Sequence, residues 1–231
     1  MLRLRVASLR KATPTTRVLR LALDGNSFSY RAGQAAMLAR DEGEMVPYSI
    51  ASAPEETAAN GWLEFLVKVD PTARFGATVD TLKRGAIVTT DGPVGSFVFP
   101  DVPPERRFLF VAGGTGIAPL RSMIQHIAAA HVPGTARLLY AARAREEFAY
   151  APELRALERQ GLLELWLTLT RETPAGWRHG HGRPGADVLR PLVDDPETLC
   201  FLCGPPGMVA ELSEALIALG IPKTRIVTEG Y

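Results

Sequence analysis

The chain has 231 residues, of which 26 are basic and 25 acidic, so its charge balance gives no indication of nucleic-acid binding. No segment approaches the roughly 20 apolar residues of a membrane helix, and residues 1–6 alternate apolar and basic side chains without the apolar core of a signal peptide. We therefore expect a cytoplasmic protein with no membrane span, built as one large domain or two of about 100 residues each.

The first part of the chain has a sequence pattern that predicts short strands. Strands are predicted at 2–10, 16–24, 62–69 and 86–90, with a further apolar run at 35–39 after Gly33 and a short helix at 75–82. Short strands separated by Gly and Pro favour a small antiparallel barrel.

Residues 100–107 form the predicted domain boundary. Three prolines within five residues cannot continue a helix or a central strand, and the charges beside them favour solvent. We expect one domain over 1–99 and a second over 105–231.

The second part alternates strands with helices. Strands are predicted at 108–112, 136–141, 163–169, 198–203 and 224–228, and helices at 117–130, 152–160, 185–193 and 207–219. This order predicts a parallel sheet covered by helices on both faces, so the expected fold class is an antiparallel barrel followed by an α/β domain.

The central motif of the chain is at 108–120. A buried strand ends at Gly113 and Gly114, and an amphipathic helix follows directly. Glycines let the backbone approach a ligand closely, and a helix N-terminus offers free N–H groups to a phosphate. Pro119 stands where a dinucleotide fingerprint would have its third glycine.

The two cysteines limit the redox chemistry of the chain. Cys200 and Cys203 are too few for a ferredoxin-type [2Fe–2S] cluster, which needs four thiolates. Their C-x-x-C spacing is also found in metal and dithiol sites, but residues 199–203 have the pattern of a buried strand, so we predict no metal site. His179 and His181 are interpreted as part of a solvated loop.

Four segments in order resemble the ferredoxin–NADP reductase family of flavoenzymes. They are Pro-Tyr-Ser-Ile-Ala-Ser at 47–52, Gly-Pro-Val-Gly-Ser-Phe at 92–97, Gly-Gly-Thr-Gly-Ile-Ala-Pro at 113–119 and Cys-Gly-Pro-Pro-Gly-Met at 203–208. The chain also ends on an aromatic residue, Tyr231, and the resemblance covers nearly its whole length.

The resemblance implies a flavin barrel and a nucleotide domain, with NAD(P)H entering the cleft between them. Hydride would pass from nicotinamide C4 to flavin N5, with Ser49 near N5, Cys203 near C4, Tyr231 stacked over the flavin as a gate, and Glu229 supporting the same site. FAD would be the flavin, with FMN or free flavin as alternatives, and NADPH or NADH the reductant.

The resemblance also implies the residues that bind the cofactors. They are Tyr48, Ser49, Ile50, Ser52, Lys68, Gly76, Ala77, Thr78, Gly114, Thr115, Gly116, Ile117, Pro119, Arg143, Thr170, Arg171, Gly204, Pro205, Met208 and Tyr231. Thr170 and Arg171 stand where NADPH-using relatives contact the 2′-phosphate, which favours NADPH, whereas residues 176–180 resemble a loop of relatives that use NADH.

One position departs from the family pattern. Val46 replaces the arginine that neutralises the flavin phosphate, a charge-assisted contact that is hard to replace. Either Arg40 or Arg74 reaches the phosphate instead, or flavin binding is loose, or the ligand is FMN or free flavin.

These observations leave three functions open. The first is an NAD(P)H oxidoreductase that passes electrons to a separate acceptor, such as a ferredoxin-like protein. The second is an NAD(P)H:flavin reductase with free flavin as substrate, and the third is a non-catalytic subunit that keeps the fold.

Overall fold

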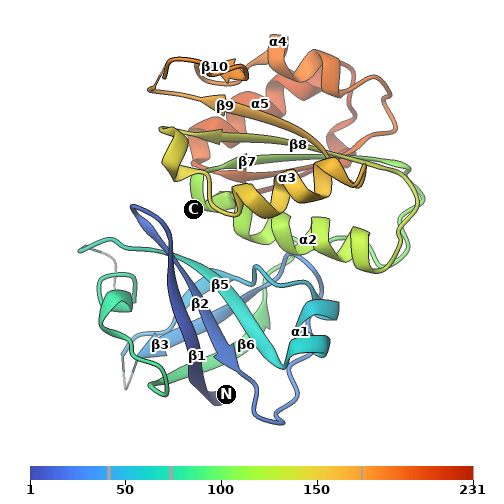
Figure 1. Cartoon of the computed structure of the whole chain (residues 1–231). Helices are drawn as coiled ribbons and strands as arrows, with labels where there is room; N and C mark the ends of the chain where they lie inside the picture. Colours follow the sequence, from blue (N-terminus) through green and yellow to red (C-terminus); the bar gives the residue numbers. More distant parts are fainter. Residues whose placement is uncertain (41–42, 73–74, 173, 231) are drawn as a thin grey trace. The chain divides into compact units, whose positions relative to one another are not determined.

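The computed structural model of the chain describes residues 1–40, 43–72, 75–172 and 174–230 (Figure 1). The chain folds into two compact units. Unit 1 comprises Met1–Phe99 with Arg121–His131, and unit 2 comprises Pro100–Leu120 with Val132–Tyr231. In the described ranges, no helix is both long and apolar enough to cross a membrane.

Unit 1 is an antiparallel barrel. Its strands follow the order β4-β3-β6-β1-β2-β5, and a bridge between Ile50 and Phe65 joins the two end strands. The N–H of Ala51 donates to the carbonyl of Glu64 at 2.7 Å in the same place. The strands are β1 (Leu2–Thr13), β2 (Thr16–Ala22), β3 (Ala35–Arg40), β4 (Val46–Ser49), β5 (Trp62–Lys68) and β6 (Ile87–Val94).

The barrel interior is filled by alternate apolar side chains of its strands. Leu4 and Val6 of β1, Leu19 and Leu21 of β2, and Phe65 of β5 belong to one buried cluster. Since neighbouring residues of a strand face opposite sides, the polar residues between them point outward. The expected antiparallel barrel is confirmed.

Two short elements of unit 1 differ from the prediction. A helix α1 (Pro54–Asn60) follows β4 where none was expected. Its signals are local: Pro54 is at the first helical position, Glu55 and Glu56 are in the first turn, and Gly61 ends the helix at φ +71°. The helix predicted at 75–82 is only a 3₁₀ turn, η1 (Val79–Thr81).

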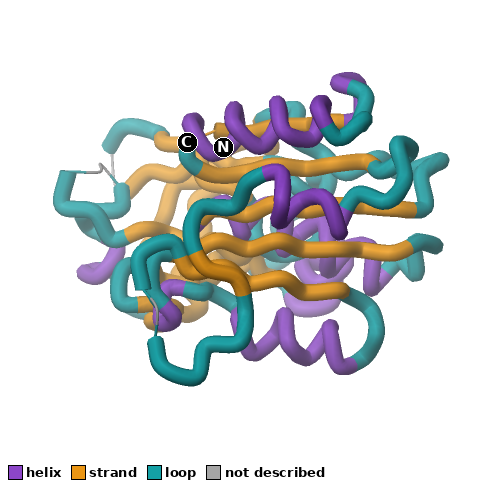
Figure 2. The backbone as a smooth tube through the Cα atoms, turned by 90° about the horizontal axis from the view of Figure 1, so that it is seen from above, coloured by secondary structure: helices purple, strands orange, loops and turns teal. Residues whose placement is uncertain are grey.

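Unit 2 contains a parallel sheet in the order β10-β9-β8-β7-β11-β12. Its strands run side by side when the molecule is seen from above (Figure 2). They are β7 (Arg107–Gly113), β8 (Thr135–Ala142), β9 (Glu164–Leu169), β10 (Gly180–His181), β11 (Leu199–Gly204) and β12 (Ile226–Gly230). The chain moves from β7 to β8 on one side and returns to β11 on the other, which places the switch of strand order between β7 and β11.

Helices accompany the strands as expected. They are α2 (Ile117–Ala129), α3 (Ala151–Arg159), α4 (Ala186–Leu189) and α5 (Pro206–Ala218), with short 3₁₀ turns η2 (Gly114–Gly116), η3 (Arg145–Glu147), η4 (Arg190–Leu192) and η5 (Lys223–Arg225). The residues of α2 from Arg121 onward belong to unit 1. The single helix predicted at 185–193 is divided into α4 and η4, and Pro191 lies in the second part.

Both faces of the parallel sheet are covered. On one face, Leu189, Leu212 and Leu216 of α4 and α5 pack with Leu109 and Cys200. The opposite face carries aromatic residues, among which the rings of Phe110 and Phe201 stack at 5.6 Å, and α3 lies on this side (Figure 1). The predicted α/β architecture is confirmed.

Candidate functional site

Two glycine loops meet at the carboxyl edge of the parallel sheet. The first glycine loop (residues 113–116) follows β7, and the second glycine loop (residues 204–207) follows β11, its neighbour in the sheet. A Cβ atom on Gly116 would lie 2.1 Å from the carbonyl oxygen of Cys203, and one on Gly113 would lie 2.8 Å from the Cε of Met208. Only glycines let these backbones approach so closely.

Both loops lead directly into helices of thirteen residues, α2 and α5. Gly114 has a φ of +54° and is exposed, and Thr115 is half-buried beside it. In the second loop Pro205 and Gly207 are exposed, and no atom lies within 4 Å of a Cβ placed on Gly207. Exposed helix N-termini behind close-packed glycines suit the phosphates of a nucleotide, so the residues present fit this group.

A buried tyrosine positions the first glycine loop. The hydroxyl of Tyr140 on β8 donates to the carbonyl of Gly114 at 3.1 Å and accepts the N–H of Ala149 at 3.2 Å. The sequence prediction did not select Tyr140, although a tyrosine inside a buried strand signals a hydroxyl that needs a partner. Ile117 and Pro119, at the start of α2, are buried and support the loop from inside the unit.

Cys203 is the penultimate residue of β11 and lies beside Glu229 of β12, its partner in the strand register. The thiol donates to the Glu229 Oε2 at 3.9 Å. Burial raises the pKa of the Cys203 thiol, and the Glu229 carboxylate raises it further, so the thiol stays protonated. Cys200 lies on the other face, packed under α4 and α5. Tyr231 lies outside the described residues.

The loops after β8 and β9 bring arginines together. Thr170 donates its N–H to the carbonyl of Ala142 at 2.8 Å, and the N–H of Arg171 donates to the carbonyl of Arg143 at 3.3 Å. Both arginines are exposed. Glu172 accepts the backbone N–H of Arg145 at 3.0 Å, so its carboxylate engages the loop backbone. The predicted residues Arg143, Thr170 and Arg171 therefore lie on two loops that are joined through their backbones.

Two aromatic rings stack on each other in the segments that follow these two loops in the sequence. The rings of Phe148 and Trp177 are parallel at 5.9 Å, and His179 lies 4.8 Å from Trp177. The Trp177 indole donates to the carbonyl of Gly180 at 2.9 Å. Within the described ranges, no cluster of three His, Cys, Asp or Glu residues is placed to hold a metal ion.

In unit 1 the structure joins Tyr48 to the segment that begins at Phe75. Tyr48 is half-buried, its ring lies 5.5 Å from that of Phe75, and its hydroxyl is hydrogen-bonded to the Gly76 backbone. Burial raises the pKa of the Tyr48 phenol, while this hydrogen bond opposes the shift. Ser49, the next residue of β4, is half-buried as well.

A cation reaches the same segment from β3. Arg40 donates to the hydroxyl of Thr81, which in turn donates to the carbonyl of Thr78 at 2.7 Å. The Thr78 hydroxyl donates to the carbonyl of Phe75 at 3.0 Å, and Ala77 between them is exposed. A flavin phosphate needs cationic or N–H donors, and Arg40, through Thr81, brings to this segment a charge that Val46 lacks. Arg74 lies outside the described residues.

Other predicted residues of unit 1 have contacts of their own. Ser52 is fully buried, and its hydroxyl accepts the N–H of Glu64 at 3.1 Å and the hydroxyl of Thr57 at 3.0 Å. Ile50 is fully buried in the barrel core. Lys68 is exposed and pairs with Asp70 at 3.5 Å. The side chains of Ser52 and Ile50 thus pack inside unit 1.

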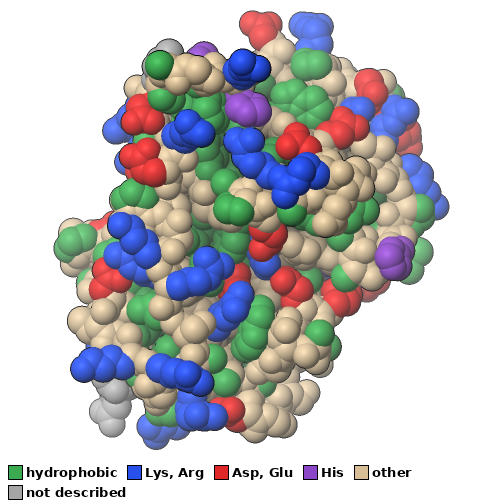
Figure 3. Space-filling model, viewed as in Figure 1, with side chains coloured by type: hydrophobic (Ala, Val, Ile, Leu, Met, Phe, Trp, Pro, Cys, Tyr) green, Lys and Arg blue, Asp and Glu red, His purple; other side chains and the backbone are tan. Residues whose placement is uncertain are grey.

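Basic side chains gather on unit 1 around β1 (Figure 3). Among the described residues, those that are exposed and take no ion pair there are Arg3, Arg10, Lys11, Lys83 and Arg84, which we call the basic surface. The N–H of Gly85 donates to the carbonyl of Val6, which places Lys83 and Arg84 beside β1. This surface favours a partner of negative charge.

Comparison with known proteins identifies both halves of the chain. The family model of the oxidoreductase FAD-binding domain matches residues 3–99, and that of the oxidoreductase NAD-binding domain matches residues 110–214. Ferredoxin–NADP reductase B of Sorangium cellulosum is 32% identical to the chain, over 98% of this chain and 96% of that protein. The oxidoreductase NAD-binding domain-containing protein 1 of Danio rerio is 31% identical, over 98% and 90%.

Other relatives are longer than this chain. NADH-cytochrome b5 reductase 1 of Pyricularia oryzae is 32% identical over 73% of this chain, but the match spans only 56% of that protein. Among solved structures, the FAD/NAD-binding domain of a nitric oxide dioxygenase from Vibrio cholerae has a TM-score of 0.86 at 24% identity, covering 99% of this chain and 98% of that one. At this identity the structural likeness shows the fold.

The fold and the matches over both halves define a two-part flavin- and nucleotide-dependent oxidoreductase. The chain belongs to the ferredoxin–NADP reductase-like family of flavoenzymes. It is an NAD(P)H-dependent flavin oxidoreductase whose cofactors are FAD and NAD(P)H. This assignment as an enzyme removes the non-catalytic subunit from the functions left open by the sequence.

Proposed function

We propose that the chain transfers hydride from nicotinamide C4 to flavin N5 and passes the electrons to a separate protein acceptor, ferredoxin-like in the first instance. The observation that carries this proposal is the convergence of the two glycine loops with Cys203 at one sheet edge, in a chain that also carries Tyr48 and Ser49 beside residues 75–78. When bound, FAD supplies a two-electron acceptor that can release its electrons one at a time.

The residues of the chain bind and orient the reactants. The first and second glycine loops hold the nucleotide phosphates through N–H groups at the starts of α2 and α5. Cys203, kept as a neutral thiol by burial and by Glu229, would contact the nicotinamide without acting as a nucleophile. Ser49 would offer its hydroxyl to a flavin ring that Tyr48 would flank.

We propose NADPH as the preferred nucleotide. Arg171 and Arg143, joined through their backbones, present two guanidinium groups at the carboxyl ends of β9 and β8. A 2′-phosphate carries two negative charges and suits guanidinium donors. The carboxylate of Glu172 accepts the backbone N–H of Arg145 at 3.0 Å, which holds it against the loop.

The acceptor is inferred from charge and from relatives. The Sorangium cellulosum relative, which matches over nearly its whole length, is a ferredoxin–NADP reductase. The basic surface of unit 1 suits an acidic partner, and such attraction weakens as salt screens it. Cytochrome b5 is the second protein candidate, because the Pyricularia oryzae relative is an NADH-cytochrome b5 reductase.

A flavin reductase is the runner-up, and Val46 is the residue that favours it. Without an arginine at this position, the flavin phosphate relies on Arg40, and FAD exchanges more readily. We expect reduction of a ferredoxin by the purified protein with NADPH, at a rate that does not rise when free FAD or FMN is added. Turnover that requires added flavin and ignores ferredoxin and cytochrome b5 would overturn the first proposal in favour of the runner-up.

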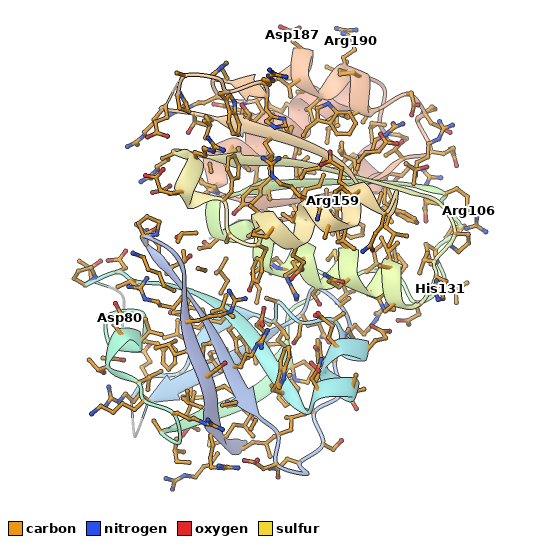
Figure 4. The ribbon with its side chains drawn as sticks, viewed as in Figure 1. Asp80, Arg106, His131, Arg159, Asp187 and Arg190 are labelled. Atoms are coloured by element: carbon orange, nitrogen blue, oxygen red, sulfur yellow. The ribbon has the colours of Figure 1, made fainter. Side chains whose placement is uncertain are left out.

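The basic surface provides the matched test of the acceptor. Arg3→Glu with Arg84→Glu is expected to raise the KM for an acidic acceptor about tenfold at low salt, with the KM for NADPH unchanged. The control is Arg190→Glu, since Arg190 projects from η4 in unit 2 (Figure 4). An equal effect of both changes would contradict docking at this surface.

A further inference from the structure

The backbone that follows Tyr48 and Ser49 turns sharply into α1, through a segment that we call the β4–α1 corner (residues 50–53). Ala51, Ser52 and Ala53 are fully buried there. A buried backbone polar group needs a partner, so each carbonyl and N–H of the corner must be satisfied inside the protein. The contacts of the corner therefore determine where β4 ends.

The N–H groups of the corner are held by the barrel and by α1. Ile50 donates to the carbonyl of Gln34 at 2.9 Å, and Ala51 donates to the carbonyl of Glu64 at 2.7 Å. Ala53 donates to the Glu56 carboxylate at 2.9 Å, the contact that begins α1. The Ser52 hydroxyl adds a further contact with the barrel, because it accepts the N–H of Glu64 at 3.1 Å.

Two neighbouring residues of α2 hold the carbonyls of Ala51 and Ser52, and the Ser52 carbonyl also accepts the Tyr30 hydroxyl at 2.9 Å. Arg121 donates from Nη1 to the carbonyl of Ala51 at 2.7 Å, and the hydroxyl of Ser122 donates to the carbonyl of Ser52 at 2.7 Å. Both residues are buried, Arg121 to 3% exposure and Ser122 to 0%. Helix α2 thus contacts the corner through its backbone, at consecutive positions.

Arg121 is itself oriented by carboxylates. Its two terminal nitrogens lie 2.9 Å and 3.0 Å from the two oxygens of Glu56, and Nη1 lies 3.9 Å from Oε1 of the buried Glu64. Glu64 is also paired with Arg20 at 2.7 Å. A planar guanidinium satisfies a carboxylate and a carbonyl together, which an ammonium group cannot do in the same geometry.

The strand that leads into the corner is short, and besides its ladder its Tyr48 contacts Phe75 and the Gly76 backbone. β4 spans only Val46–Ser49, and over that range its ladder partner is β3 alone. Its end is therefore sensitive to the corner. The corner contacts of helix α2 come from Arg121 and Ser122, which belong to the same unit as β4.

We propose that Arg121 and Ser122 are positioning residues for hydride transfer: by holding the carbonyls of Ala51 and Ser52 they set the place of Tyr48 and Ser49 against the flavin. Neither residue touches the reacting atoms. The inference rests on the proposed function, because it assigns the flavin to Tyr48 and Ser49. A displacement of about 1 Å at a reacting pair costs up to a hundredfold in rate, so small shifts of the corner are measurable.

The test uses the FAD-loaded protein and three variants of α2. Ser122→Ala removes one hydroxyl, and Arg121→Lys keeps the positive charge but loses the planar guanidinium with its two terminal nitrogens. The matched control is His126→Gln, because His126 joins α2 to α1 through Glu55 at 2.8 Å without contacting the corner carbonyls. The visible circular dichroism of the oxidised flavin and the rate constant of flavin reduction at saturating NADPH are measured for each.

We expect Ser122→Ala and Arg121→Lys to change the flavin circular dichroism and to lower the limiting reduction rate by about tenfold, with the Kd for NADPH within about twofold of the unmodified protein. His126→Gln should leave both quantities within about twofold. If Arg121→Lys does not fold, Ser122→Ala alone decides.

Two results would overturn the inference: unchanged dichroism and rate in Ser122→Ala and Arg121→Lys, or equal losses in all three variants that follow their Tm. Failure of the proposed function is distinguishable from both. In that case the unmodified protein is not reduced by NADPH or NADH, while the change in flavin dichroism of the first two variants still supports the positioning role.

Discussion

Gly116 is the residue at which a side chain would be least compatible with the close approach of the two glycine loops. A Cβ there would lie 2.1 Å from the oxygen and 2.5 Å from the carbon of the Cys203 carbonyl, and backbone atoms cannot rotate away. Gly116→Ala is expected to destabilise the fold by about 1–3 kcal/mol and to weaken NADPH binding, because the loops must separate. Thermal unfolding and NADPH titration measure the two effects.

Gly207 provides the control for this prediction. It lies in the first turn of α5, and a Cβ placed on it meets no atom within 4 Å. Gly207→Ala is expected to leave the free energy of unfolding unchanged or to raise it by up to about 1 kcal/mol. If Gly116→Ala changes the free energy of unfolding no more than Gly207→Ala does, close packing of the loops is not the reason why position 116 needs glycine.

Arg171 carries the prediction on nucleotide preference. Arg171→Ala removes one of two guanidinium groups near the proposed 2′-phosphate, so kcat/KM for NADPH should fall about tenfold while that for NADH changes by less than about twofold. Steady-state kinetics with both nucleotides check this. Arg190→Ala, which removes an exposed arginine of η4, should change neither value. Equal losses for NADPH and NADH would show that Arg171 does not bind the 2′-phosphate.

Cys200 gives a prediction on pH. Burial raises the pKa of its thiol from 9.0 to about 12, so the folded state holds the proton more tightly than the unfolded state does. Its stabilising contribution is complete below about pH 8.5 and is lost as pH rises toward 12, at up to about 1.4 kcal/mol per pH unit. Over pH 8–11, Cys200→Ala should therefore lose Tm less steeply than the unmodified protein. Parallel slopes for the two proteins would contradict the shift.

The sequence predicts which residues matter where a motif is local, and it misses those that act across the chain. Gly114 and Thr115 follow β7 directly and Cys203 is the penultimate residue of β11, so their place at the sheet edge can be predicted from the sequence. Arg121 is 70 residues from Ala51, and its contact depends on the packing of α2. The hydrogen bond from the Tyr140 hydroxyl to Gly114 could not be predicted either, because a strand pattern does not show which loop lies next to the strand.

At the scale of elements, the buried strands of the parallel sheet were predicted well. β7, β8, β9 and β11 agree with their predicted ranges within one or two residues, because buried parallel strands are continuous apolar runs. β12 begins two residues later than predicted, after η5. α1 was missed because its single buried residue, Thr57, leaves no apolar stripe to recognise.

The strand order predicts how stability is distributed in unit 2. β7 lies between β8 and β11 and is buried from Phe108 to Gly113, whereas β10 is a two-residue edge strand with both residues exposed. Amide hydrogen exchange should therefore be slowest in β7 and fastest in β10. Mass spectrometry of peptides covering each strand measures the order. Faster exchange in β7 than in β9 would contradict the observed sheet order.

At the scale of the whole molecule, the change from short strands to strand–helix alternation predicted two different architectures, and both are present. The first change of unit along the chain falls between Phe99 and Pro100, where the proline-rich segment begins. The inclusion of Arg121–His131 in unit 1 was beyond sequence reasoning. It depends on buried polar contacts, such as Ser122 with Ser52, whereas helix periodicity reports only the apolar face.

The central claim is that this chain holds FAD and reduces it with NAD(P)H. The most direct measurement is the visible spectrum of the purified protein, followed by anaerobic titration with NADPH and then NADH. We predict a bound-flavin band that is bleached by NADPH at about one nucleotide per flavin, and more slowly by NADH. A protein that shows no flavin band after incubation with FAD, or a band that neither nucleotide bleaches, would contradict the account.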